Sequence, residues 1–156
     1  MSSRSENAVS AFNQGFNCCQ SVVAAYADLF GLSADDANRI AAGSGGGMGR
    51  LQEVCGAVTG AFMLAGLRHG SLRGNDGAAK EKTYAAVREI AARFKERNKT
   101  VQCRELLGCN LLTPEGVEHF KNKDLHHTLC ARFVKEATEI VEELLTNEPQ
   151  KDTCHF

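Results

Sequence analysis

The sequence predicts an all-α fold: a single, compact helical bundle of about five to seven helices with one glycine-rich loop. Three observations favour this class. Apolar residues recur at helical spacing along most of the chain, strand-like alternation is hard to find, and proline occurs only at positions 114 and 149. With 156 residues and 43% apolar content, the chain is long enough to bury a hydrophobic core without disulfides or a structural metal ion. We expect one domain over residues 1–156, with residues 147–156 as a mobile tail.

The first two helices are predicted from their capping residues. Ser5 is a candidate N-cap for the first helix, and Gly15 is suited to ending it. Asn17 is a candidate N-cap for a second helix over about residues 18–30, which has an apolar face at helical spacing and is stopped by Gly31. Each helix is therefore expected to lie between a polar cap and a glycine.

The glycine-rich loop is predicted between two helical regions. Before it, Ser33 and the acidic residues that follow predict a short helix that ends near residue 42. The loop, residues 43–49, contains five glycines and is expected to be flexible. After it, the pattern predicts a helix over about 52–69 and a charged amphipathic helix over about 80–97.

The last third of the chain predicts a short turn over residues 103–107, a helix that starts at Pro114, and a final long helix over about residues 127–145. On the helix that follows the loop, the small residues Gly56 and Gly60 would let another helix approach closely. That partner helix can belong to the same chain, or to a second copy in a homo-oligomer.

Charge and hydropathy exclude several function classes. The 18 basic and 19 acidic residues give a formal net charge of −1, so no basic field for nucleic acid or anionic lipid is present. No apolar stretch reaches the roughly 20 residues that a transmembrane helix needs. The polar N-terminus has no signal-peptide pattern. We therefore expect a cytoplasmic protein that binds neither nucleic acid nor membrane.

The chain contains seven cysteines, which are poorly explained as a disulfide framework in a reducing compartment. No C-x-x-C spacing occurs, which removes the signature of a zinc ribbon or a thioredoxin-like site. The absence of C-x-x-C-H also means that no covalently attached haem is indicated. Metal binding, thiol redox chemistry and simple burial remain as explanations.

Three of the cysteines lie where helices are predicted to start: Cys18, Cys55 and Cys103. A helix N-terminus lowers the pKa of a thiol and favours the thiolate, which is both the nucleophile and the metal ligand. The alternative is that these cysteines pack as small hydrophobic residues in the core. Three cysteines in this setting favour a functional site.

The other cysteines are weaker candidates. Adjacent residues on a helix point about 100° apart, so only one of Cys18 and Cys19 is expected to face a site. Cys130 lies four residues after His126, a spacing that would let both bind one metal ion. Cys109 and Cys154 lie next to no predicted helix cap or glycine-rich loop and have no partner residue, so we do not include them in the predicted site.

The glycine-rich loop also fits a phosphate-binding interpretation, but its glycines match neither the Walker A nor the dinucleotide-binding pattern, and no strand precedes it. We expect instead that the backbone of Gly46, Gly47 and Gly49 comes close to the sulfur of Cys55, or to a cofactor that the cysteines hold.

Five motifs together resemble the C_GCAxxG_C_C family of redox-active proteins, in the expected order and over roughly residues 5–145. They are Gly15-Phe16-Asn17-Cys18-Cys19-Gln20, Gly45-Gly46-Gly47-Met48-Gly49-Arg50, Cys55-Gly56-Ala57-Val58-Thr59-Gly60, Cys103-Arg104-Glu105-Leu106-Leu107-Gly108 and Cys130-x-x-Phe133-Val134.

The resemblance implies four characteristic cysteines, which match Cys18, Cys55, Cys103 and Cys130. Cys19 stands where the family pattern usually has a small residue. The family is also similar to the non-haem part of split-Soret cytochromes, for which an iron–sulfur centre in addition to haem is expected. Because this chain lacks haem motifs, only a cluster site could be shared.

Two hypotheses of different classes follow. In the first, Cys18, Cys55, Cys103 and Cys130 converge in a redox protein with an unknown redox partner, either as iron–sulfur ligands or as a thiol–disulfide couple. In the thiol version, Cys55 attacks and Cys18 or Cys103 resolves. In the second, the chain is a non-catalytic module that carries zinc or a similar metal, or a helical interaction protein with buried cysteines.

Overall fold

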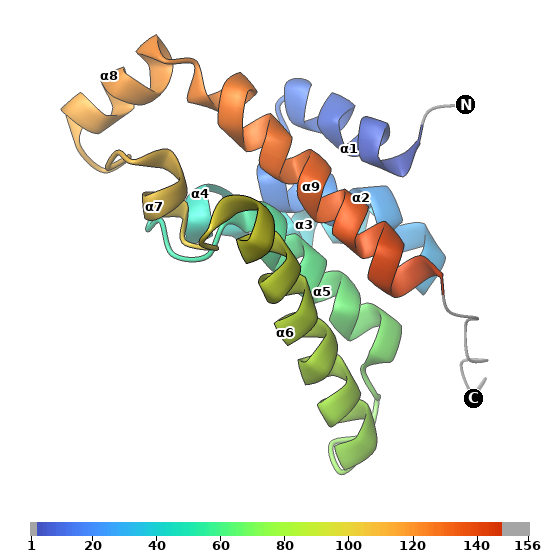
Figure 1. The fold of residues 1–156 in the computed structure, drawn as a ribbon. Coiled ribbons are helices and arrows are strands. Elements are labelled where there is room, and N and C mark those ends of the chain that lie inside the picture. Colours follow the sequence, from blue (N-terminus) through green and yellow to red (C-terminus); the bar gives the residue numbers. More distant parts are fainter. Residues whose placement is uncertain (1–2, 148–156) are drawn as a thin grey trace.

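The computed structural model describes residues 3–147 and shows an all-α fold, which confirms the predicted class (Figure 1). Within these residues, seven α-helices have eight or more residues. The helices are α1 (Arg4–Asn13), α2 (Cys18–Tyr26), α3 (Ala34–Ala41), α4 (Gly45–Met48), α5 (Gly56–His69), α6 (Gly77–Asn98), α7 (Cys103–Leu107), α8 (Pro114–Asn122) and α9 (Ala131–Val141).

Short 3₁₀ and π segments extend several of these helices. The second predicted helix is α2 followed by the 3₁₀ turn η1 (Ala27–Phe30), and the η2 turn (Ala42–Ser44) follows α3. The last predicted helix consists of α9 flanked by two π-helical turns, η3 (His126–Cys130) and η4 (Glu142–Thr146). Apart from Asn147, the tail predicted at the C-terminus lies outside the described residues, and Cys154 lies there too.

The core is built around α2 and α5, which pack directly against each other. A Cβ on Gly60 would lie 3.0 Å from Cβ of Val22 and 3.1 Å from the carbonyl oxygen of Cys19, so the two backbones meet at this glycine. The close approach predicted for Gly56 and Gly60 is therefore made by a helix of the same chain. The helices α1, α6 and α9 complete the core around this pair.

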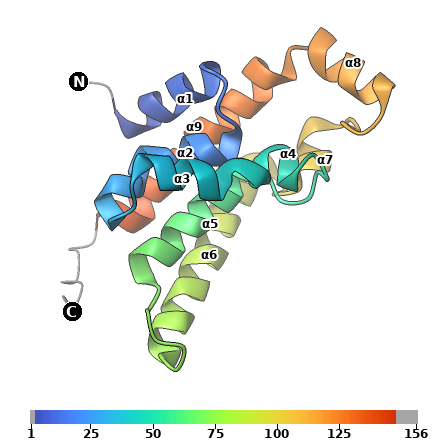
Figure 2. The ribbon, with the colours of Figure 1, turned by 180° about the vertical axis from the view of Figure 1, so that it is seen from behind.

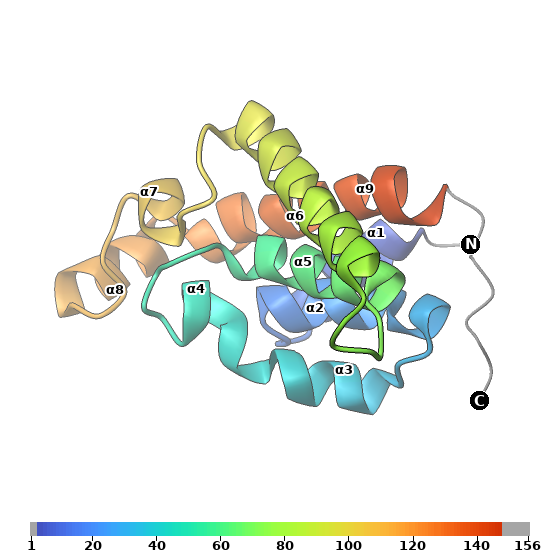
Figure 3. The same ribbon diagram turned by 90° about the horizontal axis from the view of Figure 1, so that it is seen from below.

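The starts of α2, α5 and α7, where Cys18, Cys55 and Cys103 lie, gather at one end of the bundle. In Figures 1 and 2, α4, α7 and α8 lie together at that end, beyond the N-terminal ends of α2 and α5. Figure 3 shows α6 crossing over α5 away from that end. No helix within residues 3–147 has both the length and the apolar character needed to cross a bilayer.

Asn17 caps α2 as the sequence predicts. Its side-chain oxygen accepts a hydrogen bond from the backbone N–H of Gln20 at 2.9 Å, and the Gln20 side chain accepts one from the backbone N–H of Asn17 at 2.9 Å. Its amide nitrogen also donates to the carbonyl oxygen of Ala42 at 2.9 Å. Asn17 therefore fixes the start of α2 against the turn that leads into the glycine-rich segment.

The first helix starts two residues earlier than predicted. Ser3, rather than Ser5, is the N-cap of α1, and its hydroxyl accepts from the backbone N–H of Glu6 at 3.1 Å. Ser5 lies inside the first turn, where its hydroxyl accepts a 2.9 Å hydrogen bond from Thr138 of α9. The Glu6 side chain also accepts from the backbone N–H of Ser3 at 2.8 Å, and this capping box favours Ser3 over Ser5 as the cap.

Replacing Asn17 with alanine should lower the free energy of unfolding by about 1–2 kcal/mol, because the N-cap of α2 and the bond to Ala42 are both lost. Urea denaturation followed by circular dichroism measures the loss. Asn13→Ala, at an exposed position near the end of α1, is the matched control and should change stability by less than about 0.5 kcal/mol. Equal stability of the two variants would contradict the capping role.

Candidate functional site

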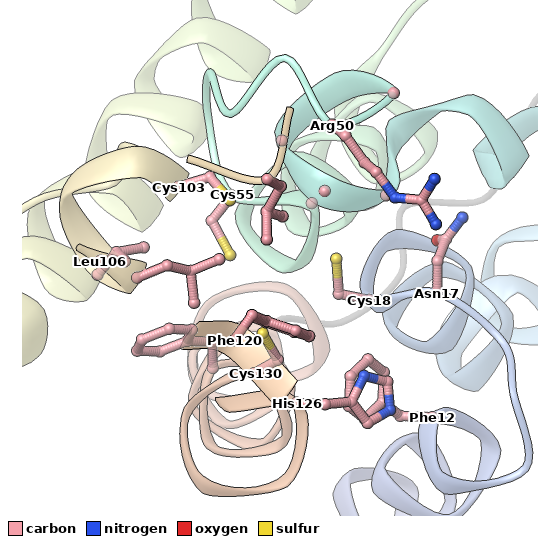
Figure 4. A pocket seen from close by; sticks show the side chains of 18 of the residues that line it. Phe12, Asn17, Cys18, Arg50, Cys55, Cys103, Leu106, Phe120, His126 and Cys130 are labelled. Atoms are coloured by element: carbon pink, nitrogen blue, oxygen red, sulfur yellow. The ribbon is translucent and has the colours of Figure 1, made fainter. Parts of the chain in front are cut away.

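Four cysteines from four separate elements line one cavity of about 670 Å³. Cys18 is the first residue of α2, Cys55 precedes α5, Cys103 is the first residue of α7, and Cys130 is the last residue of η3. Figure 4 shows their side chains facing the same space. The structure thus brings together four cysteines that are far apart in the sequence, and each is a free thiol.

Cys55 and Cys103 are held side by side by a short antiparallel pairing. Val54 and Gln102 form an isolated bridge, and the N–H of Cys55 donates to the carbonyl of Val101 at 2.8 Å. The N–H of Cys103 donates to the carbonyl of Glu53 at 2.7 Å. Each cysteine therefore sits at the end of an extended segment and at the start of a helix.

This pairing corrects the predicted start of the helix after the glycine-rich segment. The helix was expected to begin near residue 52, but α5 begins at Gly56, and Cys55 is its N-cap with φ −48° and ψ 130°. Residues 52–55 stay outside the helix because their backbone pairs with residues 101–104 around the bridge between Val54 and Gln102. Helical periodicity could not show this, since the pairing partner is distant in the sequence.

The glycine-rich segment is wound tightly rather than open and flexible. Gly46, Gly47 and Gly49 have φ values of 64°, 64° and 55°, and Met48 and Arg50 between and after them share the left-handed conformation. The N–H of Gly49 donates to the carbonyl of Gly43 at 2.9 Å, which ties the turn together. Glycine is the residue type that adopts this conformation without strain.

The glycines let the backbone come within contact distance of two cysteines. A Cβ on Gly47 would lie 2.7 Å from Cβ of Cys103, and a Cβ on Gly56 would lie 2.5 Å from the sulfur of Cys18. Gly46, Gly47 and Gly49 all line the cavity. Gly47 thus lies against the Cβ of Cys103, and the backbone N–H of Gly46 acts on the Cys18 thiol.

Burial raises the pKa of the Cys18 thiol, and backbone N–H groups act in the opposite direction. The N–H groups of Gly46, Cys19 and Ala57, together with that of Cys18 itself, lower this pKa by stabilising negative charge on the sulfur. Cys18 therefore has a buried sulfur inside a set of backbone donors. Such a setting suits a sulfur that carries charge because it is bound to a cation.

The other three site thiols also have raised pKa values. Burial, followed by the charge of Cys18, raises the pKa of Cys55 well above its usual value, that of Cys103 to about 11 and that of Cys130 to about 12. The expected lowering of thiol pKa at a helix N-terminus is outweighed by burial and by repulsion between neighbouring thiolates. As free thiols, these side chains are neutral at pH 7.

Cys19 and Cys109 flank the site without lining the cavity. The thiol of Cys19 turns the other way and donates to the sulfur of Met63 at 3.9 Å, which confirms that only one of the adjacent cysteines faces the site. Cys109 lies near enough that its charge raises the pKa of Cys103 and Cys130. The sequence offered no signal for this proximity, because residues 109–111 form an irregular segment.

His126 lines the same cavity as Cys130 and stacks on Phe12, with ring centroids 4.1 Å apart and an interplanar angle of 17°. Burial lowers its pKa, so the ring is neutral at pH 7. Among the described residues, no group of three or more His, Cys, Asp or Glu side chains is arranged to hold a single metal ion. This holds for His126 and equally for the four cysteines, which line one cavity without being gathered around a single point.

Gln52 is a site residue that the sequence did not reveal. Its side chain is 2% exposed, its amide nitrogen donates to the carbonyl of Cys109 at 2.8 Å, and its amide oxygen accepts from the N–H of Leu111 at 2.8 Å. Burial raises the pKa of the neighbouring Cys103 thiol, and the polar side chain of Gln52 lowers it by a smaller amount. A lone glutamine has no distinguishing pattern in a single sequence.

The donor set fits a soft metal centre. Four thiols are available, backbone N–H groups face the Cys18 sulfur, and within residues 3–147 no carboxylate lines the cavity, whereas Arg50 and Lys121 do. Thiolates select zinc, copper(I) and iron–sulfur centres. An anionic centre with four thiolate ligands would meet favourable charges on this lining.

Comparison with known proteins agrees with the cysteine pattern. The chain matches no curated protein and no solved structure. Residues 16–144 match the model of a family described as "Putative redox-active protein (C_GCAxxG_C_C)". That range contains all four cavity cysteines, and in this chain the central motif reads Cys55-Gly56-Ala57-Val58-Thr59-Gly60. The chain therefore belongs to the C_GCAxxG_C_C family of redox-active proteins.

Proposed function

We propose that the protein is a cytoplasmic electron carrier in which Cys18, Cys55, Cys103 and Cys130 are the ligands of an iron–sulfur cluster. The observation that carries this proposal is the convergence of four cysteines, from four elements, on one cavity of about 670 Å³. Four cysteine thiolates are the usual ligand set of both [2Fe–2S] and [4Fe–4S] clusters. When bound, such a cluster supplies one-electron redox chemistry.

Burial and charge favour a cluster over a thiol–disulfide couple. An attacking thiolate needs a lowered pKa and access to its substrate. The pKa of Cys55, the thiol expected to attack, is instead raised well above its usual value by burial and then by Cys18. Thiolates from four buried or half-buried cysteines would repel one another, and iron supplies the positive charge that would hold them together.

The chain's own residues would hold and insulate the centre. The backbone N–H groups around Cys18 stabilise negative charge on its sulfur, and the pairing of residues 52–55 with 101–104 fixes Cys55 against Cys103. Phe12, Phe120 and other apolar side chains that line the cavity would limit the access of water. Hydrogen bonds to sulfur and exposure to solvent are two of the properties that set the reduction potential of such centres.

Anaerobic purification followed by iron, sulfide and zinc analysis tests the proposal. We expect a brown protein with visible absorption and matching iron and sulfide contents. Cys55→Ser should lose most of the iron, whereas Cys19→Ser, whose thiol faces Met63, should retain it. A colourless wild-type protein with one bound zinc would establish the metal-carrier alternative, and a metal-free protein with a reducible disulfide would establish the thiol couple.

A further inference from the structure

Two side chains that can donate hydrogen bonds to an anion lie over adjacent glycines in the cavity lining. A Cβ on Gly45 would lie 2.7 Å from Cβ of Asn17, and a Cβ on Gly46 would lie 2.9 Å from Cγ of Arg50. Asn17 and Arg50 both line the cavity, and Figure 4 shows the guanidinium group of Arg50 next to the amide of Asn17. The two glycines therefore leave room for both polar groups at one part of the lining.

Both groups have protons that no other described residue accepts. Within residues 3–147, the guanidinium group of Arg50 forms no ion pair and no hydrogen bond. The amide nitrogen of Asn17 has two protons, and one of them is donated to the carbonyl oxygen of Ala42 at 2.9 Å. A guanidinium group is always charged and has a planar set of donors that matches a carboxylate. An anion at this place would meet a cation and an amide proton that is available.

The backbone conformation of Arg50 does not explain why an arginine stands there. Its φ is 66°, a left-handed conformation that is unfavourable for a residue with a Cβ. The same turn uses Gly46, Gly47 and Gly49 in this conformation, and glycine adopts it without strain. Strained residues cluster at sites where ligands bind. The side chain of Arg50 is therefore the part of this residue that calls for an explanation.

An aromatic wall borders the same part of the cavity. The rings of Phe12 and His126, which both line the cavity, are stacked with their centroids 4.1 Å apart. In Figure 4 this pair and Arg50 lie to one side of Cys18, and Cys55 lies to the other. The cavity volume of about 670 Å³ is within the range of about 300–1,000 Å³ that is typical of pockets for small molecules. An apolar surface and a cation are thus available together, apart from the Cys55 sulfur.

We propose that this part of the cavity binds a small aromatic carboxylate. Arg50 and the second amide proton of Asn17 hold the carboxylate group, and the stacked rings of Phe12 and His126 contact the aromatic body. No carboxylate within residues 3–147 lines the cavity, so no group of like charge opposes such a ligand. The ligand would lie beside the proposed iron–sulfur centre, and in this respect the inference rests on the proposed function.

Isothermal titration calorimetry of the anaerobically purified protein tests this site with benzoate and phenylacetate, each compared with its uncharged amide. Both carboxylates should bind. Benzamide and phenylacetamide have nearly the same shapes without the charge and should bind at least about tenfold more weakly. Arg50→Gln should weaken carboxylate binding by a similar factor. Arg104→Gln removes an exposed arginine that does not line the cavity and should leave carboxylate binding unchanged.

A role of Arg50 in balancing the charge of a metal centre would give a different result. Arg50→Gln would then lower the iron content, and the carboxylates would bind no better than their amides. That result overturns the inference, as does a wild-type protein that binds neither carboxylate or an Arg50→Gln variant that binds them equally well. Iron and sulfide analysis of the same samples separates the two proposals. An iron–sulfur protein that binds neither carboxylate overturns the inference alone, and a colourless protein that binds phenylacetate through Arg50 overturns the proposed function alone.

Discussion

Replacing Gly56 with alanine is expected to destabilise the protein by about 3 kcal/mol and to abolish the four-cysteine site. The new Cβ would lie 2.5 Å from the sulfur of Cys18, 2.6 Å from the carbonyl oxygen of Ser44 and 3.4 Å from the backbone nitrogen of Cys19. Such overpacking typically costs about 1–3 kcal/mol, and a backbone carbonyl has little freedom to move away. Urea denaturation measures the stability, and iron content after anaerobic purification measures the site.

Gly66→Ala is the matched control for this substitution. Gly66 lies in the same helix, and a Cβ there would meet nothing within 4 Å. Because alanine is the better helix former, this variant should be more stable than the wild type by up to about 1 kcal/mol. If the two alanine variants were equally stable, α5 could not approach Cys18 as closely as described.

The protein without bound metal is expected to lose several kcal/mol of stability as the pH rises from about 9 to about 12. In the folded state the pKa of Cys103 is raised to about 11 and that of Cys130 to about 12, mainly by burial, from an ordinary value of 9.0. Unfolding releases these thiols to ionise near pH 9. The stabilisation is therefore fully present below pH 9 and is lost as the pH passes through the folded-state values.

Two measurements check this pH dependence. Unfolding free energies from urea denaturation should fall above pH 9, and the slope should be smaller in Cys130→Ala, which removes one of the raised thiols. The thiolate absorption that is lost in Cys130→Ala should appear in the folded wild-type protein only well above pH 9. Absorption that rises below pH 8 would instead show an activated thiol, as the thiol–disulfide mechanism requires.

The local parts of the fold were predictable because short-range chemistry determines them. Asn17 caps α2, Gly31 ends the turn after it with φ 81°, and Thr113 with Pro114 starts α8, all as the sequence indicates. Each of these signals acts within a few residues. The misplaced cap of α1 was also readable locally, because Ser3 and Glu6 have the spacing of a capping box and Ser5 has no acidic or amide residue three positions later.

The parts that could not be predicted depend on residues that are distant in the sequence. The start of α5 is set by the pairing with residues 101–104, and the roles of Gln52 and Cys109 appear only once that pairing is formed. The pKa of Cys55 was misjudged for the same reason, because helix-start chemistry is local and burial is not. The convergence of the four cysteines itself came from motif resemblance rather than from spacing.

The pairing of residues 52–55 with 101–104 also determines when the site can exist during synthesis. The two segments emerge from the ribosome about fifty residues apart, with the whole of α6 between them, and Cys130 follows later still. A chain that ends before residue 130 lacks the fourth of the thiols that line the cavity. On the proposed function, the centre would therefore be completed only after the last helix has been made and has packed against the rest of the bundle.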